Sequence, residues 1–229
     1  MTFGIEVEFK SSTSLLGSMD VPALFAYPSK MGLTVRDSFF SDRGIVHGDG
    51  ESDFQEVSRE LRGETRRPLM VVDAESVGSS RFGEEVLKRM RVRGADIWFM
   101  THVEYVEDVF DAFNTVAEMV FAPLHNIHDR HELEDILSVS DSFVPSMFVN
   151  NGKALDIDGG YVDLTDAIDS ISSAGCCRMC VVDTDSSVTP EEWETVSDEH
   201  PALIPFVRRE EFEVDFGEFR NVIRPYDPL

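Results

Sequence analysis

The chain has 229 residues, of which 42% are hydrophobic and 28% are charged, a composition typical of one soluble globular domain. Its 44 acidic residues outnumber 20 basic ones and give a net charge of −24. Such a surface repels phosphate backbones and anionic lipids, which argues against a nucleic-acid partner. The sequence contains no apolar run of the roughly 20 residues that a membrane-spanning helix needs and no signal-peptide pattern at its start. We therefore expect a cytoplasmic protein without a membrane partner.

The first 50 residues are the least regular part of the sequence. Glycine and serine are frequent there, and Pro22, Pro28, Gly44 and Gly48 are typical of turns. A first strand is nevertheless needed, and the candidates are residues 3–9 and 32–35. We expect residues 1–50 to form an irregular N-terminal segment that contains this strand.

From residue 51 onward, helices alternate with short apolar strands. In the first helix, Ser52 or Asp53 is the candidate cap, and the apolar residues recur at helical spacing. Strands that alternate with helices predict a parallel sheet with right-handed crossovers. We expect helices at 52–61, 82–91, 104–116, 129–138, 162–174 and 190–197, and strands at 69–73, 96–101, 118–123, 142–149, 178–183, 202–207 and 221–224.

These elements predict a single TIM-type (β/α)8 barrel that spans residues 1–229. The segment between the last two strands is unusual, because residues 213–217 are too few and too β-prone for a full helix. We therefore expect a divergent barrel whose last β/α unit is shortened.

Polar residues follow the predicted strands. In a (β/α)8 barrel the carboxyl ends of the strands converge on one face, where the chemistry of such enzymes takes place. The predicted rim consists of Asp73, Glu75, Thr101, His102, His125, Asn126, Asn150, Asn151, Asp183, Asp185, Arg208 and Arg209.

Four of the predicted strands, with the turns that follow them, resemble a known family. Residues 68–189 are similar to the histidine-biosynthesis isomerase and cyclase barrels, in particular to an archaeal-type branch related to the ribotide isomerase. The resemblance implies a (β/α)8 barrel with acid/base catalysis at the strand ends. It rests on Met70-Val71-Val72-Asp73-Ala74-Glu75, on residues 97–109 and 142–155, and on Val181-Val182-Asp183-Thr184-Asp185.

The departures from this family are as informative as the similarities. Family isomerases carry glycines after the third and seventh strands, where backbone N–H groups approach substrate phosphates, but this chain has Met100-Thr101-His102 and Phe206-Val207-Arg208 there. The family's fifth-strand acid falls on Phe148, which cannot transfer a proton. Its partner acid would be Asp37, which lies farther from the next glycine than the family spacing. We therefore expect no genuine ribotide isomerase activity.

The leading hypothesis is a divergent barrel of unknown reaction that binds a small phosphorylated or anionic metabolite. We expect Asp73, Asp183 and His102 as catalytic residues, acting in an isomerase-like or lyase-like reaction if the protein is an enzyme. Arginine pairs well with phosphate through its planar fork of N–H donors. The expected substrate-binding residues are Arg208, Arg209, Asn150 and Thr101, and no cofactor is expected.

Two alternatives remain open. One is a metal-dependent sugar-phosphate epimerase or aldolase-like enzyme, with Asp73, His102, His125 and Asp183 as ligands. The other is a non-catalytic barrel that acts as a binding or scaffold subunit, and a homo-oligomer is compatible with the sequence. The enzyme hypothesis predicts that Asp73, His102 and Asp183 converge on one open pocket.

All three cysteines fall within residues 176–180. Cys177 and Cys180 have the spacing of a redox pair or of half a zinc site, but a structural zinc site needs about four ligands and no second cysteine pair exists. Cys180 also leads directly into an apolar strand, which favours a small buried residue.

Overall fold

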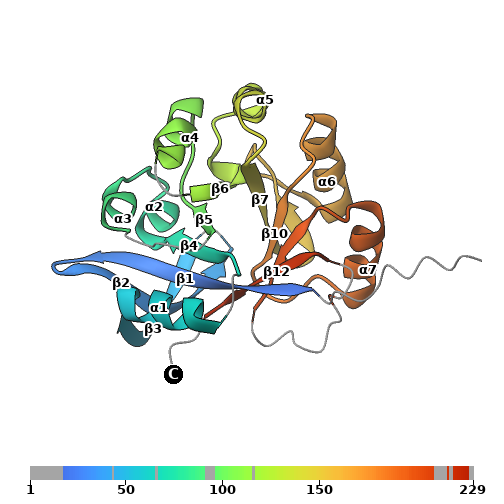
Figure 1. The fold of residues 1–229 in the computed structure, drawn as a ribbon. Helices are drawn as coiled ribbons and strands as arrows, with labels where there is room; N and C mark the ends of the chain where they lie inside the picture. Colours follow the sequence, from blue (N-terminus) through green and yellow to red (C-terminus); the bar gives the residue numbers. More distant parts are fainter. Residues whose placement is uncertain are drawn as a thin grey trace, which may run out of the picture.

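The computed structural model describes residues 18–42, 44–64, 67–90, 96–114, 117–208, 216 and 219–226. Within them, eight parallel strands form a closed barrel in the order β1, β4, β5, β6, β7, β10, β11, β12, and β12 pairs again with β1. The prediction of a TIM-type (β/α)8 barrel is therefore confirmed (Figure 1). The strands are β1 (Met19–Ser29), β4 (Leu69–Asp73), β5 (Ile97–Met100), β6 (Ala117–Pro123), β7 (Phe143–Asn150), β10 (Cys180–Asp183), β11 (Ile204–Phe206) and β12 (Asn221–Pro225).

Helices surround the barrel on its outer side (Figure 1). Several begin at the side-chain caps that helix starts prefer: Asp129 accepts a hydrogen bond from the Glu132 N–H, and Thr189 with Glu192 forms a capping box. The helices are α1 (Phe54–Glu64), α2 (Ala74–Ser79), α3 (Glu85–Arg89), α4 (Val106–Phe113), α5 (Arg130–Val139), α6 (Leu164–Ser173) and α7 (Pro190–Glu199), with a short 3₁₀ turn η1 (Leu124–Asn126). Of these, α2 and η1 are absent from the sequence-based prediction.

Two separate apolar layers hold the barrel together. Residues such as Leu69 and Val71 belong to the layer between strands and helices, whereas Met70 and Val72 belong to the layer inside the barrel. This alternation follows from the period of two along a strand. Both faces of each parallel strand are buried, which explains why the strands read as continuous apolar runs.

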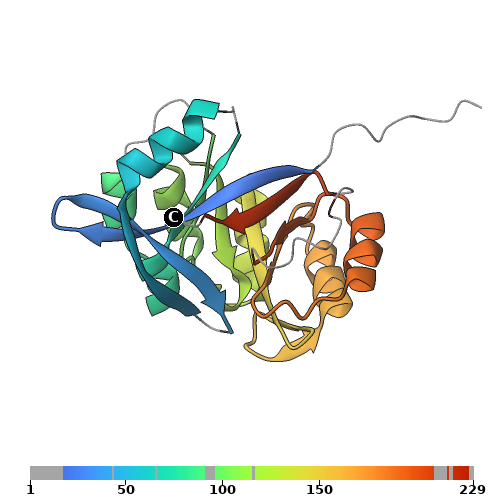
Figure 2. The same ribbon diagram turned by 90° about the horizontal axis from the view of Figure 1, so that it is seen from below.

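The first barrel strand is not where the sequence placed it. It is β1, while residues 32–35 belong to β2 (Gly32–Ser41), which pairs antiparallel with β1 and with β3 (Gly44–Asp53). The candidate at residues 3–9 lies outside the described residues. Pro22 and Pro28 suggested a loop, but a proline removes only its own N–H, and both residues are paired within β1. The described part of the N-terminal segment therefore forms the first barrel strand, β1, and an antiparallel extension of it, β2 and β3 (Figure 2).

The connection between β11 and β12 contains no helix among its described residues. Two aromatic side chains pack where a helix would lie, because the rings of Phe216 and Phe219 lie 5.5 and 5.8 Å from the Trp193 ring of α7. A second insertion, the hairpin of β8 (Lys153–Leu155) and β9 (Tyr161–Asp163), follows β7. No helix in the described part of the chain is long and apolar enough to cross a membrane.

Candidate functional site

The carboxyl end of the barrel, where the sequence predicted a polar rim, is filled by aromatic rings. Phe25, Phe148 and Phe206, from β1, β7 and β11, all face the barrel interior, and the ring centroids of Phe25 and Phe206 lie 6.4 Å apart. Phe40 of β2 packs against all three, with ring centroids 5.1, 5.0 and 5.0 Å away. We call Phe25, Phe40, Phe148 and Phe206 the aromatic plug; each of its side chains is at most 3% exposed.

Asp73 lies at the end of β4 and caps helix α2. Its carboxylate accepts hydrogen bonds from the Ser76 N–H at 3.0 Å and from the Ser76 hydroxyl at 2.8 Å. Because Val72 faces the barrel interior, its neighbour Asp73 faces the helices. Burial raises the pKa of Asp73 to about 6, and the hydrogen bonds from Ser76 offset part of this rise. The carboxylate therefore stabilises the turn after β4.

Asp183 has the same role at the end of β10. Its two carboxylate oxygens accept hydrogen bonds from the N–H groups of Ser187 and Val188, each at 3.0 Å. Burial raises the pKa of Asp183 as well. In the ring of eight strands β10 lies opposite β4, with three strands between them on either side. The structure therefore places the two predicted catalytic aspartates at opposite sides of the barrel.

Thr101 and His102 follow β5 and are both buried. His102 Nε2 lies 4.0 Å from a carboxylate oxygen of Glu104, but burial lowers the pKa of His102 and favours the neutral ring. The hydroxyl of Thr101 and Nδ1 of His102 have no hydrogen-bond partner among the described residues. β5 neighbours β4, so His102 is brought to the Asp73 side of the ring and not to that of Asp183.

The four residues of the metal alternative are similarly dispersed. His125 lies in η1, and its ring packs on Phe148 of the aromatic plug with centroids 5.2 Å apart. Within the described ranges, no group of three or more His, Cys, Asp or Glu side chains is arranged to hold a metal ion.

Two of the predicted substrate-binding residues, Arg208 and Asn150, make internal contacts. The guanidinium of Arg208 lies 4.6 Å from the centre of the Phe39 ring, and its Nη2 donates to the Phe40 carbonyl at 3.4 Å. Asn150 donates to the Thr184 hydroxyl at 3.3 Å. Arg208 therefore connects β2, the strand that carries Phe40, to the end of β11. Arg209 lies outside the described residues.

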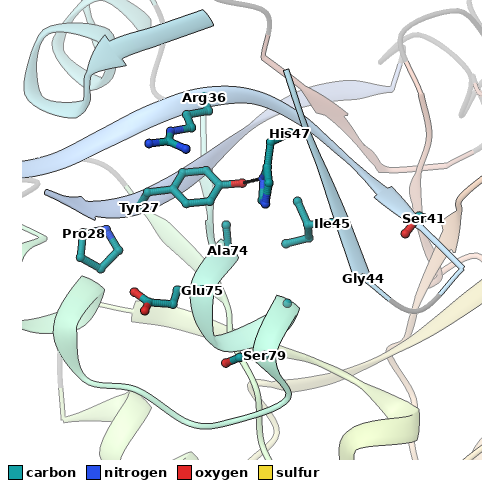
Figure 3. A pocket seen from close by; sticks show the side chains of 11 residues that line it. Tyr27, Pro28, Arg36, Ser41, Gly44, Ile45, His47, Ala74, Glu75 and Ser79 are labelled. Carbon is teal, nitrogen blue, oxygen red and sulfur yellow. Dashed lines mark hydrogen bonds between the residues drawn. The ribbon is translucent and has the colours of Figure 1, made fainter. Parts of the chain in front are cut away.

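An open pocket lies beside the aromatic plug, between the β1–β2–β3 extension and helix α2. It has a volume of about 660 Å³, and we call it the hairpin pocket. Figure 3 shows that its two walls differ in character: the β wall carries a phenol, a guanidinium and an imidazole, and the α2 wall carries a carboxylate. The polar lining residues are Tyr27, Arg36, Ser41, His47, Glu75 and Ser79.

Three side chains on the β wall form a hydrogen-bonded chain. The Tyr27 hydroxyl lies 2.6 Å from His47 Nδ1 and 3.0 Å from the Ser38 hydroxyl. Ser38 and His47 are directly opposite in the β2–β3 pairing, so their side chains share one face of the sheet. Burial raises the pKa of Tyr27, while the hydrogen bond from Ser38 and the charge of Arg36 act in the opposite direction. At neutral pH the phenol is therefore protonated.

Arg36 supplies the positive charge of the pocket. Its guanidinium lies 5.0 Å from the centre of the Tyr27 ring and 3.6 Å from a carboxylate oxygen of Glu51. Both side chains of that ion pair are at least 40% exposed, and exposed ion pairs contribute little to stability. Arg36 can therefore exchange Glu51 for an anionic ligand at small cost.

The sequence-based prediction did not include Tyr27, Arg36 or His47. A register shift in the β2–β3 pairing between Arg36 and Ser38 places His47 opposite Ser38, and no local sequence pattern predicts this shift. Glu75 was predicted on the rim and does line the hairpin pocket. The alternation of residues 32–41, a signal of a half-buried strand, could have indicated β2.

No model of a known protein family matches this chain, and no curated protein is detectably similar to it.

Proposed function

We propose that this barrel binds a small anionic metabolite in the hairpin pocket and lacks ribotide isomerase activity. The observation that carries the proposal is the combination of Arg36, His47 and Tyr27 on one wall of an open cavity. Charge-assisted hydrogen bonds from arginine to a phosphate or carboxylate are among the strongest polar contacts in proteins. The cation that the sequence led us to expect at Arg208 is thus supplied by Arg36.

The barrel end supports the proposed lack of isomerase activity. An acid/base pair must reach the substrate, but Asp73 and Asp183 cap backbone N–H groups on opposite sides and Phe148 is part of the aromatic plug. The resemblance to the histidine-biosynthesis barrels supports a proposal of shared ancestry, whereas the strand ends that carry the resemblance serve packing in this chain.

A panel of anions tests the binding function. Inorganic phosphate, acetate, pyruvate, dihydroxyacetone phosphate and ribose 5-phosphate would be screened by thermal shift, because a ligand of the folded state raises its stability. Affinities of the hits would be measured by calorimetry. We expect Arg36→Met to lower affinity by about 10- to 100-fold, the value of a charge-assisted hydrogen bond. The proposal fails if no anion binds or if Arg36→Met binds as the wild type does.

Arg130→Met is the matched control. Arg130 is a surface arginine of α5 that pairs with Glu134 and with serines of α6, and it is not part of the hairpin pocket. Equal losses in the two variants would indicate unspecific attraction of anions to arginine and would contradict the proposed site.

A non-catalytic scaffold subunit is the second candidate function. The aromatic plug favours it, since four buried rings occupy the place where barrel enzymes bind substrates. The two candidates differ in one outcome of the same screen: a scaffold predicts that none of the anions stabilises the protein.

A further inference from the structure

The Ser38–Tyr27–His47 chain has the geometry of a proton relay. We propose that Tyr27, assisted by His47, is a catalytic general base that removes a proton from the carbon next to the carbonyl group of a small anionic carbonyl compound in the hairpin pocket. This inference rests on the proposed function, because the anionic group of the compound is held by Arg36. Two sources of that group, a carboxylate and a phosphate, fit the same chemistry.

The contacts of Tyr27 define which direction the proton can take. Ser38 is only 1% exposed, and its hydroxyl lies 3.0 Å from the phenol oxygen. When Ser38 donates to Tyr27 and Tyr27 donates to His47 Nδ1, one lone pair of the phenol oxygen remains free. His47 is exposed and can exchange its Nε2 proton with solvent. The relay therefore begins at the buried Ser38 hydroxyl and ends at the His47 ring, which is open to solvent.

The step balances without any co-reactant. The C–H bond of the substrate breaks, its proton moves to the Tyr27 oxygen, and the original phenol proton moves to His47 Nδ1. The electron pair of the C–H bond forms the C=C bond of an enolate, whose negative charge rests on the former carbonyl oxygen. The His47 imidazolium and the Arg36 guanidinium carry the complementary charge. Reversal of the step with a solvent-derived proton completes an exchange at carbon.

The protonation state of Tyr27 before the reaction agrees with its role as a general base. Half-burial keeps its pKa above the ordinary value, so the residue enters the reaction as a hydroxyl able to pass a proton on. The 2.6 Å separation from His47 is within the reach that nucleophile–base pairs show in active sites. Tyr105 and His128 form a similar pair on the surface, with the Tyr105 hydroxyl 3.4 Å from His128 Nδ1, and neither residue lines the hairpin pocket.

Solvent exchange measured by proton NMR tests the inference. The full chain is incubated in D2O with pyruvate, the carboxylate probe, or dihydroxyacetone phosphate, the phosphate probe, and loss of the C–H signal next to the carbonyl is followed. We expect exchange faster than in buffer for at least one probe. Tyr27→Phe and His47→Gln should slow the exchange measured at saturating probe concentration by about 100-fold or more, the usual contribution of general base catalysis.

Tyr105→Phe is the control, and its exchange rate should equal that of the wild type. Thermal unfolding of Tyr27→Phe checks that the variant is folded. Binding of a probe without exchange, or exchange in Tyr27→Phe at the wild-type rate, would overturn the relay and leave the proposed binding function intact. Failure of both probes and all other anions to bind would overturn the binding function and the relay together.

Discussion

The ring of Phe40 packs edge-on against the ring of Phe148, with the two centroids 5.0 Å apart, at the carboxyl end of the barrel. Phe148 stands at the position where the resemblance to the histidine-biosynthesis barrels places a catalytic acid. Phe40 belongs to β2, part of the antiparallel extension between the first two barrel strands. Phe148 of β7 and Phe40 of β2 thus form one apolar contact, which stabilises a closed barrel end.

Replacement of Phe40 by alanine should be among the most destabilising single changes in the chain. Its ring is 3% exposed and touches three other rings, and loss of a buried phenylalanine side chain costs about 3–5 kcal/mol. Urea denaturation of Phe40→Ala measures this loss. Phe110→Ala is the control, because Phe110 is 52% exposed and its removal should change the free energy of unfolding by about 0.5 kcal/mol or less. A loss below about 1 kcal/mol for Phe40→Ala would contradict the packed barrel end.

The barrel could be predicted from sequence because its signals are local. Each strand from residue 69 onward is a short apolar run between helical patterns, and most observed bounds lie within a few residues of those expected. The prediction of the first strand was wrong for a physical reason. Pro22 and Pro28 are typical of turns locally, but pairing with β12 and β2 holds this segment in the extended conformation of β1. Helix α2 was missed because Gly78 and three serines within residues 74–80 are poor helix formers, and the Asp73 cap supports it instead.

The candidate site was harder to predict than the fold. Polar residues at strand ends were identified, but a sequence cannot tell whether a carboxylate points at a substrate or at the N–H groups of the next turn. The carboxylates of Asp73 and Asp183 accept hydrogen bonds from the N–H groups of the next turn. The hairpin pocket depends on side chains from three strands whose register is set by tertiary pairing, so no spacing within the sequence brings Tyr27, Ser38 and His47 together.

Asp73 should make the stability of the protein depend on pH. Its pKa is about 6 in the folded protein, above the value of about 3.9 in an unfolded chain. The folded state therefore binds this proton more tightly, and the resulting stabilisation is complete below about pH 4 and is lost as the pH rises through 6.

Asp73→Asn removes this dependence, because the amide oxygen still accepts a hydrogen bond from the Ser76 N–H but cannot ionise. Between pH 4 and pH 7 the variant should gain stability relative to the wild type by an amount on the order of 3 kcal/mol, the equivalent of about two pKa units. Chemical denaturation at several pH values measures the difference. Parallel pH profiles of the two proteins would show that Asp73 ionises without penalty and would refute its burial.

Gly48 should be essential for the register that aligns Ser38 with His47. A Cβ atom at this position would lie 2.9 Å from the Asp37 carbonyl oxygen and 2.9 Å from an Asp37 carboxylate oxygen, closer than real contacts allow. Gly48→Ala should therefore force β2 and β3 apart locally and cost about 1–3 kcal/mol, as other cases of overpacking do.

The readout for Gly48→Ala is amide hydrogen exchange along β2 and β3, which should become faster in the variant. Gly160→Ala is the control, since a Cβ atom there meets nothing within 4 Å. Unchanged exchange and stability in Gly48→Ala would mean that the β2–β3 pairing tolerates a side chain at the register shift, and the packing described for Asp37 would be wrong.

The three cysteines should differ sharply in their reactivity with a thiol reagent such as Ellman's reagent. Cys177 is exposed, whereas Cys176 and Cys180 are buried. Burial raises the pKa of Cys176 to about 11 and also raises that of Cys180, which lies inside the barrel, so both thiols lack the reactive thiolate at neutral pH. One thiol per chain should react fast in the folded protein, and all three should react in denaturant. Cys177→Ser should abolish the fast phase in the folded protein, and the two remaining thiols should still react in denaturant. Two fast thiols in the native protein would show that the segment from Cys176 to Cys180 opens to solvent, contrary to the buried position of Cys180 in β10.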